Sequence, residues 1–244
     1  MKKKFCNRGI NLPHKEMRTD FGDLLPKWHA GINRYLGLHA DGDPPWAYNE
    51  RANVGLLAGA AWSLSNSCAL EEYTSTKRVP GKKDLDGRNA KKTGRIDLYV
   101  CVRGGPGLAC EAKLARPLIS SRVPGKKSVD DVIKKAKSAW RSTQALLTRS
   151  ADKRYALTFV SPRFTQPNAL RVAPKVLRRV VSKALDGWLE AVKERLEKLS
   201  PRPGYSWVFP SSARLARGRR SGSYPGVMVI IQRQQRARPA RQKK

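Results

Sequence analysis

The chain has 244 residues, of which 40% are hydrophobic, and its 50 lysines and arginines against 19 aspartates and glutamates give a formal net charge of +31. The apolar share suffices for a folded core, which excludes wholesale disorder, and the charge predicts a polyanionic partner, because Lys and Arg that neutralise phosphates release counterions. A membrane is disfavoured, since no apolar run approaches the roughly 18 residues of a span and no basic amphipathic stretch carries an aromatic and leucine face. The first residues are basic but lack the apolar segment of a signal peptide, so we expect a cytoplasmic protein.

The cysteines and histidines give no sign of a metal centre. Cys6, Cys68, Cys101 and Cys110 form no CxxC pair, so zinc is disfavoured and buried free thiols are expected. The three histidines all precede residue 45 without metal-ligand spacing, and no role is assigned to them.

In the N-terminal half, residues 1–45 are rich in Gly, Pro and Asp with little periodicity, and we expect them to form an arm. Asn49 is a favourable N-cap, and it begins a predicted helix over 49–64 with one apolar face. A strand is predicted over 68–79, then a basic loop, and then a β-hairpin over 94–113 in which a Gly/Pro turn separates two strand-like runs.

Periodicity predicts a second series of elements before a basic tail. They are a helix over 129–147, a buried strand over 154–162, a long amphipathic helix from Pro174 and two late strands over 206–210 and 226–232. The tail contains no acid and no large apolar residue, so disorder is expected there. The predicted division is an arm (1–45), a core (46–165), a C-terminal helix and strands packed on the core (166–232) and the tail (233–244).

The motif RVPGKK occurs twice, at 78–83 and at 122–127, before and after the hairpin. Pro-Gly favours a turn, so each copy would present two lysines at a tip. The two copies could clamp phosphates, or they could be ordinary solvated turns, and the sequence leaves both interpretations open.

The hairpin places two acids and a lysine on one face. Alternate side chains of a strand share a face, so Asp97 on the first strand lies on the same side as Glu111 and Lys113 on the second. With Gly105 at the apex, Asp97 would stand opposite Lys113, and Glu111 would be its diagonal neighbour about 7–8 Å away. A divalent cation with oxygen ligands fits between two such carboxylates. The alternative is a surface Asp–Lys pair of little energetic weight.

The order helix, three strands, helix, strand, with Asp97 on the second strand and Glu111-Ala-Lys113 on the third, resembles the PD-(D/E)XK nuclease superfamily. The resemblance covers about 46–162, and Ile96 stands where the family often has proline. It implies an α/β fold with a restriction-endonuclease-like core, extended by the arm and by the C-terminal helix and strands. Members also place an acid in the first helix, where this chain has Glu50.

Four further side chains have less certain roles. Glu50 could belong to a metal site, or it could simply complement the helix dipole in the first turn. Of Glu71 and Glu72 on the first strand, Glu72 is the better candidate, although a solvated glutamate is the common case. Gln144 could reach the site or be an amide at the edge of the core.

The resemblance implies metal-dependent cleavage of DNA. Asp97, Glu111 and Glu50 would hold Mg²⁺, or Mn²⁺ in its place, and Lys113 would orient or help to deprotonate a water and stabilise developing charge. On the second helix Lys134, Lys137 and Arg141 suit a nucleic-acid backbone, although they could equally form a solvated face. The complete set of expected nucleic-acid contacts adds Lys82, Lys83, Arg95, Lys126 and Lys127.

Three classes of function account for the charge. A Mg²⁺-dependent deoxyribonuclease, an endonuclease rather than an exonuclease, is favoured, and DNA is preferred over RNA on the resemblance alone. A non-catalytic nucleic-acid-binding protein is the alternative, and a structural protein of a ribonucleoprotein is the third. The sequence leaves open whether the chain acts alone or as a homodimer.

Overall fold

The computed structural model describes residues 7–39, 44–83, 89–102, 105–120, 125–144, 146, 151–164, 174–210 and 223–234. Its centre is a seven-stranded sheet with the strand order β1-β8-β9-β6-β4-β3-β2, in which β4 and β6 are parallel and the other neighbouring strands are antiparallel. These strands are β1 (Asn7–Asn11), β2 (Ser67–Lys83), β3 (Asn89–Val102), β4 (Leu108–Ala115), β6 (Lys153–Val160), β8 (Gly204–Phe209) and β9 (Val227–Gln234). The predicted mixed α/β class is therefore confirmed.

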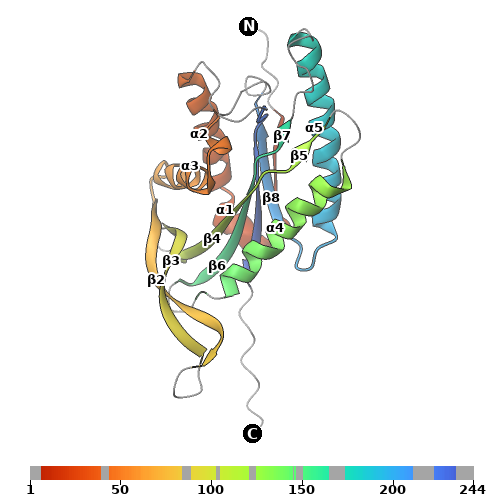
Figure 1. Cartoon of the computed structure of the whole chain (residues 1–244). Coiled ribbons are helices and arrows are strands. Elements are labelled where there is room, and N and C mark those ends of the chain that lie inside the picture. The colour runs from red at the N-terminus through yellow and green to blue at the C-terminus, as the bar shows by residue number, and fades with distance from the viewer. Residues whose placement is uncertain are drawn as a thin grey trace.

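Helices cover both faces of the sheet (Figure 1). One apolar cluster joins the first three helices to one face, and a second joins α4 and α5 to the other. The helices are α1 (Lys15–Phe21), α2 (Leu24–Leu38), α3 (Glu50–Trp62), α4 (Lys126–Gln144) and α5 (Pro174–Glu197), with a short 3-10 turn η1 (Pro45–Ala47) before α3 and a two-stranded sheet of β5 (Leu118–Ile119) and β7 (Arg163–Phe164).

The predicted order of elements is present, because α3, β2, β3, β4, α4 and β6 follow one another along the chain. Asn49 is the N-cap of α3, and its side-chain oxygen accepts a hydrogen bond of 2.8 Å from the Ala52 backbone nitrogen. Pro174 begins α5, as its fixed φ favours.

We expect Asn49→Ala to destabilise the protein by about 1 kcal/mol, because the Ala52 N–H loses its side-chain cap. Urea unfolding would measure this loss. Thr19→Ala is the control, since the Thr19 hydroxyl only donates a hydrogen bond to the Lys15 carbonyl of its own helix. Equal stability of wild type and Asn49→Ala would contradict the assigned cap.

The N-terminal segment is more regular than its sequence suggested, and it packs into the core of the fold. β1 pairs with β8, and on α2 the side chains of Trp28 and Ile32 are fully buried. Asp20 of α1 accepts hydrogen bonds from Lys153 and from the Tyr155 hydroxyl on β6. These contacts join segments that lie more than 130 residues apart, and no local pattern could reveal them.

The hairpin register differs from the prediction by two residues. Leu98 pairs with Cys110 and Val100 with Leu108, so the register places Asp97 opposite Glu111, not opposite Lys113. The turn decides this offset, and 103–104 lie outside the described residues. A shift of two residues leaves every side chain on its predicted face, because the side-chain period of a strand is also two.

Strands β2 and β3 continue well past β4 as a two-stranded β-ribbon (72–83 with 89–96; Figure 1). Part of the predicted basic loop is therefore strand, and 84–88 lie outside the described residues. The first RVPGKK copy belongs to the end of β2, whereas the lysines of the second copy begin α4 and 121–124 are not described.

The expectation of free thiols is wrong for two cysteines. Cys68 and Cys101 are cross-strand partners on β2 and β3 with Cα atoms 5.4 Å apart, and they form a disulfide. Cys110 is free and buried, and Cys6 lies outside the described residues. Burial raises the pKa of the Cys110 thiol, so this thiol stays protonated.

Candidate active site

The predicted acids meet where β3 leaves β4. β3 pairs with β4 over Leu98–Val100, and one residue earlier the Asp97 carboxylate accepts a 2.7 Å hydrogen bond from the backbone nitrogen of Ala112. A side chain thus takes the place of a strand partner at this edge of β4. Glu111 and Lys113 flank Ala112 and share the Asp97 face by strand parity.

Glu50 enters the same site from α3. It is the first residue of that helix, and its Oε1 lies 3.8 Å from the Lys113 Nζ. Arg116, which follows β4, donates hydrogen bonds to the carbonyls of Ala47 and Tyr48. This arginine therefore ties the start of α3 to the end of β4, which fixes Glu50 next to Lys113.

Burial and neighbouring charges shift the pKa values of two acids of the site. The Glu111 side chain is buried, with 5% of the residue exposed, and burial is the main cause that raises its pKa to about 7. The Asp97 charge raises this pKa further, whereas Lys77 and Lys113 lower it. The pKa of Glu50 is also raised, first by burial and then by Asp97, against the opposing effect of Lys113.

Lys77 is a member of the site that the sequence did not indicate. Its Nζ lies 2.6 Å from Glu111 Oε1, and the two side chains are only 16% and 6% exposed. Lys77 comes from the β-ribbon, which bends back so that this residue also bridges Leu146 beyond α4. No spacing or local motif in the sequence indicates such a long-range bend.

Of the remaining candidates, Glu72 pairs with two arginines and the other two are exposed. Glu72 has a φ of 54°, and its carboxylate binds Arg51 at 3.2 Å and Arg95 at 3.1 Å. Glu71 and Gln144 are exposed. Glu72 therefore holds two arginines near the base of the β-ribbon, and Arg95, expected to contact nucleic acid, shares its charge with this acid.

Two carboxylates of the site are the candidates for holding a metal ion. Within the described part of the chain, no cluster of three or more His, Cys, Asp or Glu side chains is arranged to hold a metal. Mg²⁺ commonly takes only one or two carboxylates and completes its shell with water and substrate phosphate. Asp97 and Glu111 are the two carboxylates of the site that could hold such an ion, and the Ala112 carbonyl accepts a 2.8 Å hydrogen bond from Lys113.

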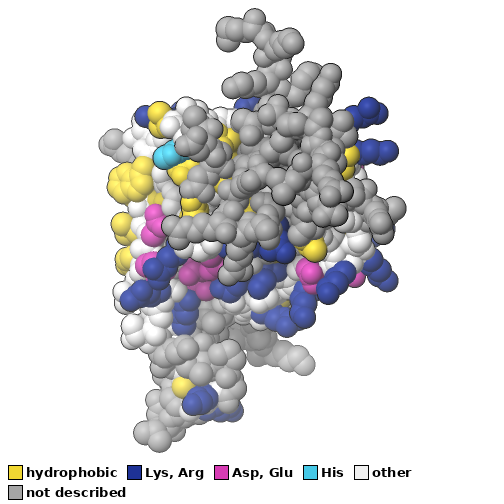
Figure 2. Space-filling view, turned by 45° about the horizontal axis from the view of Figure 1, so that its top comes forward, with side chains coloured by type: hydrophobic (Ala, Val, Ile, Leu, Met, Phe, Trp, Pro, Cys, Tyr) yellow, Lys and Arg dark blue, Asp and Glu magenta, His cyan; other side chains and the backbone are white. Residues whose placement is uncertain are grey.

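The cations expected to contact nucleic acid lie on the surface. The expected contact residues Lys82, Lys83, Arg95, Lys126, Lys127, Lys134, Lys137 and Arg141 are all exposed, and Figure 2 shows acidic side chains bordered by Lys and Arg on one face. Lys135 of α4, which the sequence did not single out, is the α4 cation that lowers the pKa of Glu50.

The basic tail begins later than predicted. β9 extends to Gln234, and Arg233 forms a 3.1 Å salt bridge with Glu16. Residues 235–244 lie outside the described part of the chain, so their expected disorder stays a prediction.

Deletion of 235–244 removes Arg236, Arg238, Arg241, Lys243 and Lys244 and no acid. If these cations bind phosphates, the slope of log affinity against log salt should flatten by about 0.9 for each phosphate that the shortened protein no longer neutralises on duplex DNA. Anisotropy titrations at several salt concentrations would measure this slope. An unchanged slope would mean that the tail does not touch the nucleic acid.

Comparison with known proteins adds no relative, since no family model, no curated protein and no solved structure matches the chain. Among the helices that the structure describes, none is long and apolar enough to cross a membrane.

Proposed function

We propose that this protein is a metal-dependent nuclease that hydrolyses phosphodiester bonds in DNA. The observation that carries the proposal is the convergence of Asp97, Glu111, Lys113 and Glu50 at the edge where β3 and β4 separate. A restriction-endonuclease-like core, cytoplasmic location, endonuclease action and assembly as a homodimer belong to the same proposal. The order of α3, β2, β3, β4, α4 and β6 supports that core.

Each residue has a chemical task in this reaction. Mg²⁺, when bound, supplies an electrophile for the phosphate and lowers the pKa of a bound water. Asp97 and Glu111 would hold the ion through their carboxylates, and Glu50 holds Lys113 by charge. Lys113 orients the attacking water and stabilises the negative charge that develops on the phosphate oxygens.

Lys77 has to leave Glu111, at least in part, before both Glu111 oxygens can face a cation. Its ammonium occupies Oε1 at 2.6 Å, where it neutralises a buried carboxylate. Because Lys77 belongs to the β-ribbon, nucleic acid that binds the β-ribbon cations could move this lysine from the carboxylate to a phosphate. Occupation of the β-ribbon by substrate and completion of the metal site would then be linked.

The alternative is a nucleic-acid-binding protein without catalysis. The Lys77–Glu111 pair favours it, since the pair satisfies a buried carboxylate without any metal. In that case Asp97 serves only to cap the Ala112 N–H, and the net charge of +31 accounts for binding.

Incubation with linear, circular and branched DNA, with Mg²⁺ or with a chelator, separates the two functions. The nuclease proposal predicts that products appear with Mg²⁺ alone, and cut circles would favour endonuclease action. Binding without products on every substrate would support the alternative.

A further inference from the structure

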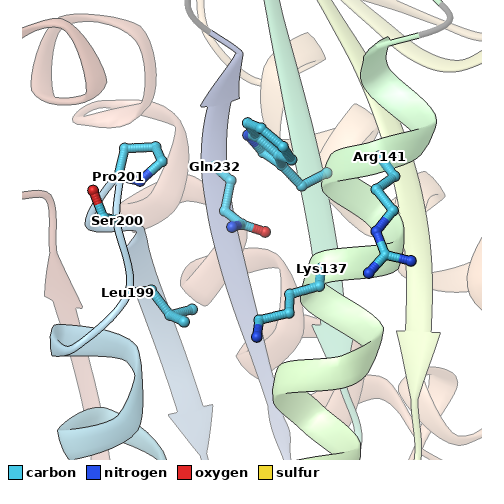
Figure 3. Close-up of a pocket in the computed structure, with 7 residues that line it drawn as sticks. Lys137, Arg141, Leu199, Ser200, Pro201 and Gln232 are labelled. Carbon is cyan, nitrogen blue, oxygen red and sulfur yellow. The ribbon is translucent and has the colours of Figure 1, made fainter.

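A cavity of about 250 Å³ lies between α4, β9 and the loop after α5, separate from the acid cluster (Figure 3). Lys137, Trp140 and Arg141 line it from α4, Leu199 and Pro201 line it from the loop, and Gln232 lines it from β9. Figure 3 shows Gln232 between the loop and the two cations of α4. Ligand pockets for larger molecules usually measure about 300–1,000 Å³, so this cavity suits one small planar group.

Two polar atoms of the lining are buried without a partner among the described residues. Gln232 is 6% exposed, and its Oε1 accepts no hydrogen bond there, nor does the Trp140 Nε1 donate one. Buried polar groups are nearly always paired, so the unpaired acceptor of Gln232 at this cavity points to a ligand. That ligand carries a hydrogen-bond donor.

Charge and shape narrow the chemistry of the ligand. Lys137 and Arg141 are exposed at this cavity, where they can bind a phosphate. The Trp140 indole supplies a flat apolar surface, and aromatic side chains of this kind stack unpaired bases. Every nucleobase has a hydrogen-bond donor on its pairing edge, so the Gln232 Oε1 could accept from any base that stacks on Trp140.

We propose that this cavity binds one unstacked base of a nucleic-acid strand, with the adjacent phosphate on Lys137 and Arg141. The inference rests on the proposed binding of nucleic acid, but it does not require cleavage. It adds a second contact on the substrate strand, separate from the acids, where a single-stranded or distorted region would be held. Such a contact favours substrates with an unpaired base over intact duplex.

The test compares two labelled single strands of about 12 nucleotides, one with bases and one with abasic sugars throughout, by anisotropy in chelator. The wild type should bind the strand with bases about tenfold more tightly, because the abasic strand can neither stack nor pair. Gln232→Leu and Trp140→Phe should each reduce this preference several-fold without changing affinity for the abasic strand. Lys137→Gln should weaken both strands alike.

Two control variants match these changes elsewhere. Trp62→Phe alters an exposed tryptophan of α3, and Lys27→Gln removes an exposed charge of α2. Neither should alter the preference for the strand with bases, although Lys27→Gln can weaken the binding of both strands by the effect of one charge. Gln232→Leu removes an acceptor that has no described partner, so the melting temperature of this variant should not be lower than that of the wild type. This makes a folding defect easy to distinguish from a binding defect.

An equal preference in wild type, Gln232→Leu and Trp140→Phe would overturn the pocket while leaving nucleic-acid binding intact. Lack of a preference in the wild type would do the same. Failure to bind either strand would overturn the pocket, and failure to bind duplex DNA as well would contradict the proposed function. Binding with the expected preference but no cleavage in Mg²⁺ would contradict the nuclease alone.

Discussion

Asp97→Asn is expected to lower the rate of DNA cleavage by about 10²–10³ while DNA binding in chelator stays close to that of the wild type. Asparagine keeps an oxygen that can accept the hydrogen bond from Ala112, so the edge of β4 should remain intact. Under the proposed function, the substitution removes the negative charge that would hold the cation. Divalent-ion binding, followed by calorimetry, should therefore weaken together with activity.

Lys113→Met provides the contrast, since it removes charge stabilisation but no ligand. Cleavage should fall by a similar factor, whereas divalent-ion binding should survive, because one repulsive charge is gone from the site. Asp23→Asn, an exposed change at the start of α2, is the matched control and should leave both properties unchanged. Cleavage by Asp97→Asn at the wild-type rate would contradict the assigned role of this acid.

Glu111 is expected to make the stability of the metal-free protein fall as pH rises from about 4.5 to 7. Its folded pKa of about 7 lies above the ordinary 4.5, so in this window the folded protein keeps a proton that the unfolded chain releases. Stability from this group is complete below pH 4.5 and is lost as the pH passes 7. The shift corresponds to about 3 kcal/mol.

Glu111→Gln should remove this part of the pH dependence, because glutamine does not titrate. Urea unfolding in chelator at pH 4.5, 6 and 8 gives the free energy of unfolding of both proteins. The difference between the two values isolates Glu111, because the contributions of the other titrating groups largely cancel. Glu190→Gln, an exposed change on α5, is the matched control and should leave the curve unchanged. A difference between wild type and Glu111→Gln that is constant over this range would contradict the raised pKa.

The sequence predicted the shared face of the site acids because that property is local. Strand parity has a period of two residues, so Asp97, Glu111 and Lys113 lie on one face whether the hairpin offset is right or shifted by two. Asn49 was found for the same reason, since a cap acts within one helical turn. The offset itself depends on turn geometry, which the residues around Gly105 did not determine.

Long-range contacts account for what the sequence did not reveal. Lys77 reaches Glu111 only because the β-ribbon bends back toward the end of α4, and Gln232 reaches the cavity only because β9 lies beside β6. The helix α2 was missed for a different reason. Its apolar residues repeat at helical spacing, but the same stretch contains Pro26, Gly31 and Gly37, and proline and glycine are typical of loops and turns.

The most direct test of the central claim is the conversion of supercoiled plasmid, measured for the wild type and for Asp97→Asn purified in the same way. The account predicts nicked or linear products from the wild type with Mg²⁺, none in chelator, and at least about 10²-fold less from the variant. Equal products from both proteins would contradict the catalytic role of Asp97. Binding of plasmid by the wild type without any product in Mg²⁺ or Mn²⁺ would contradict the account.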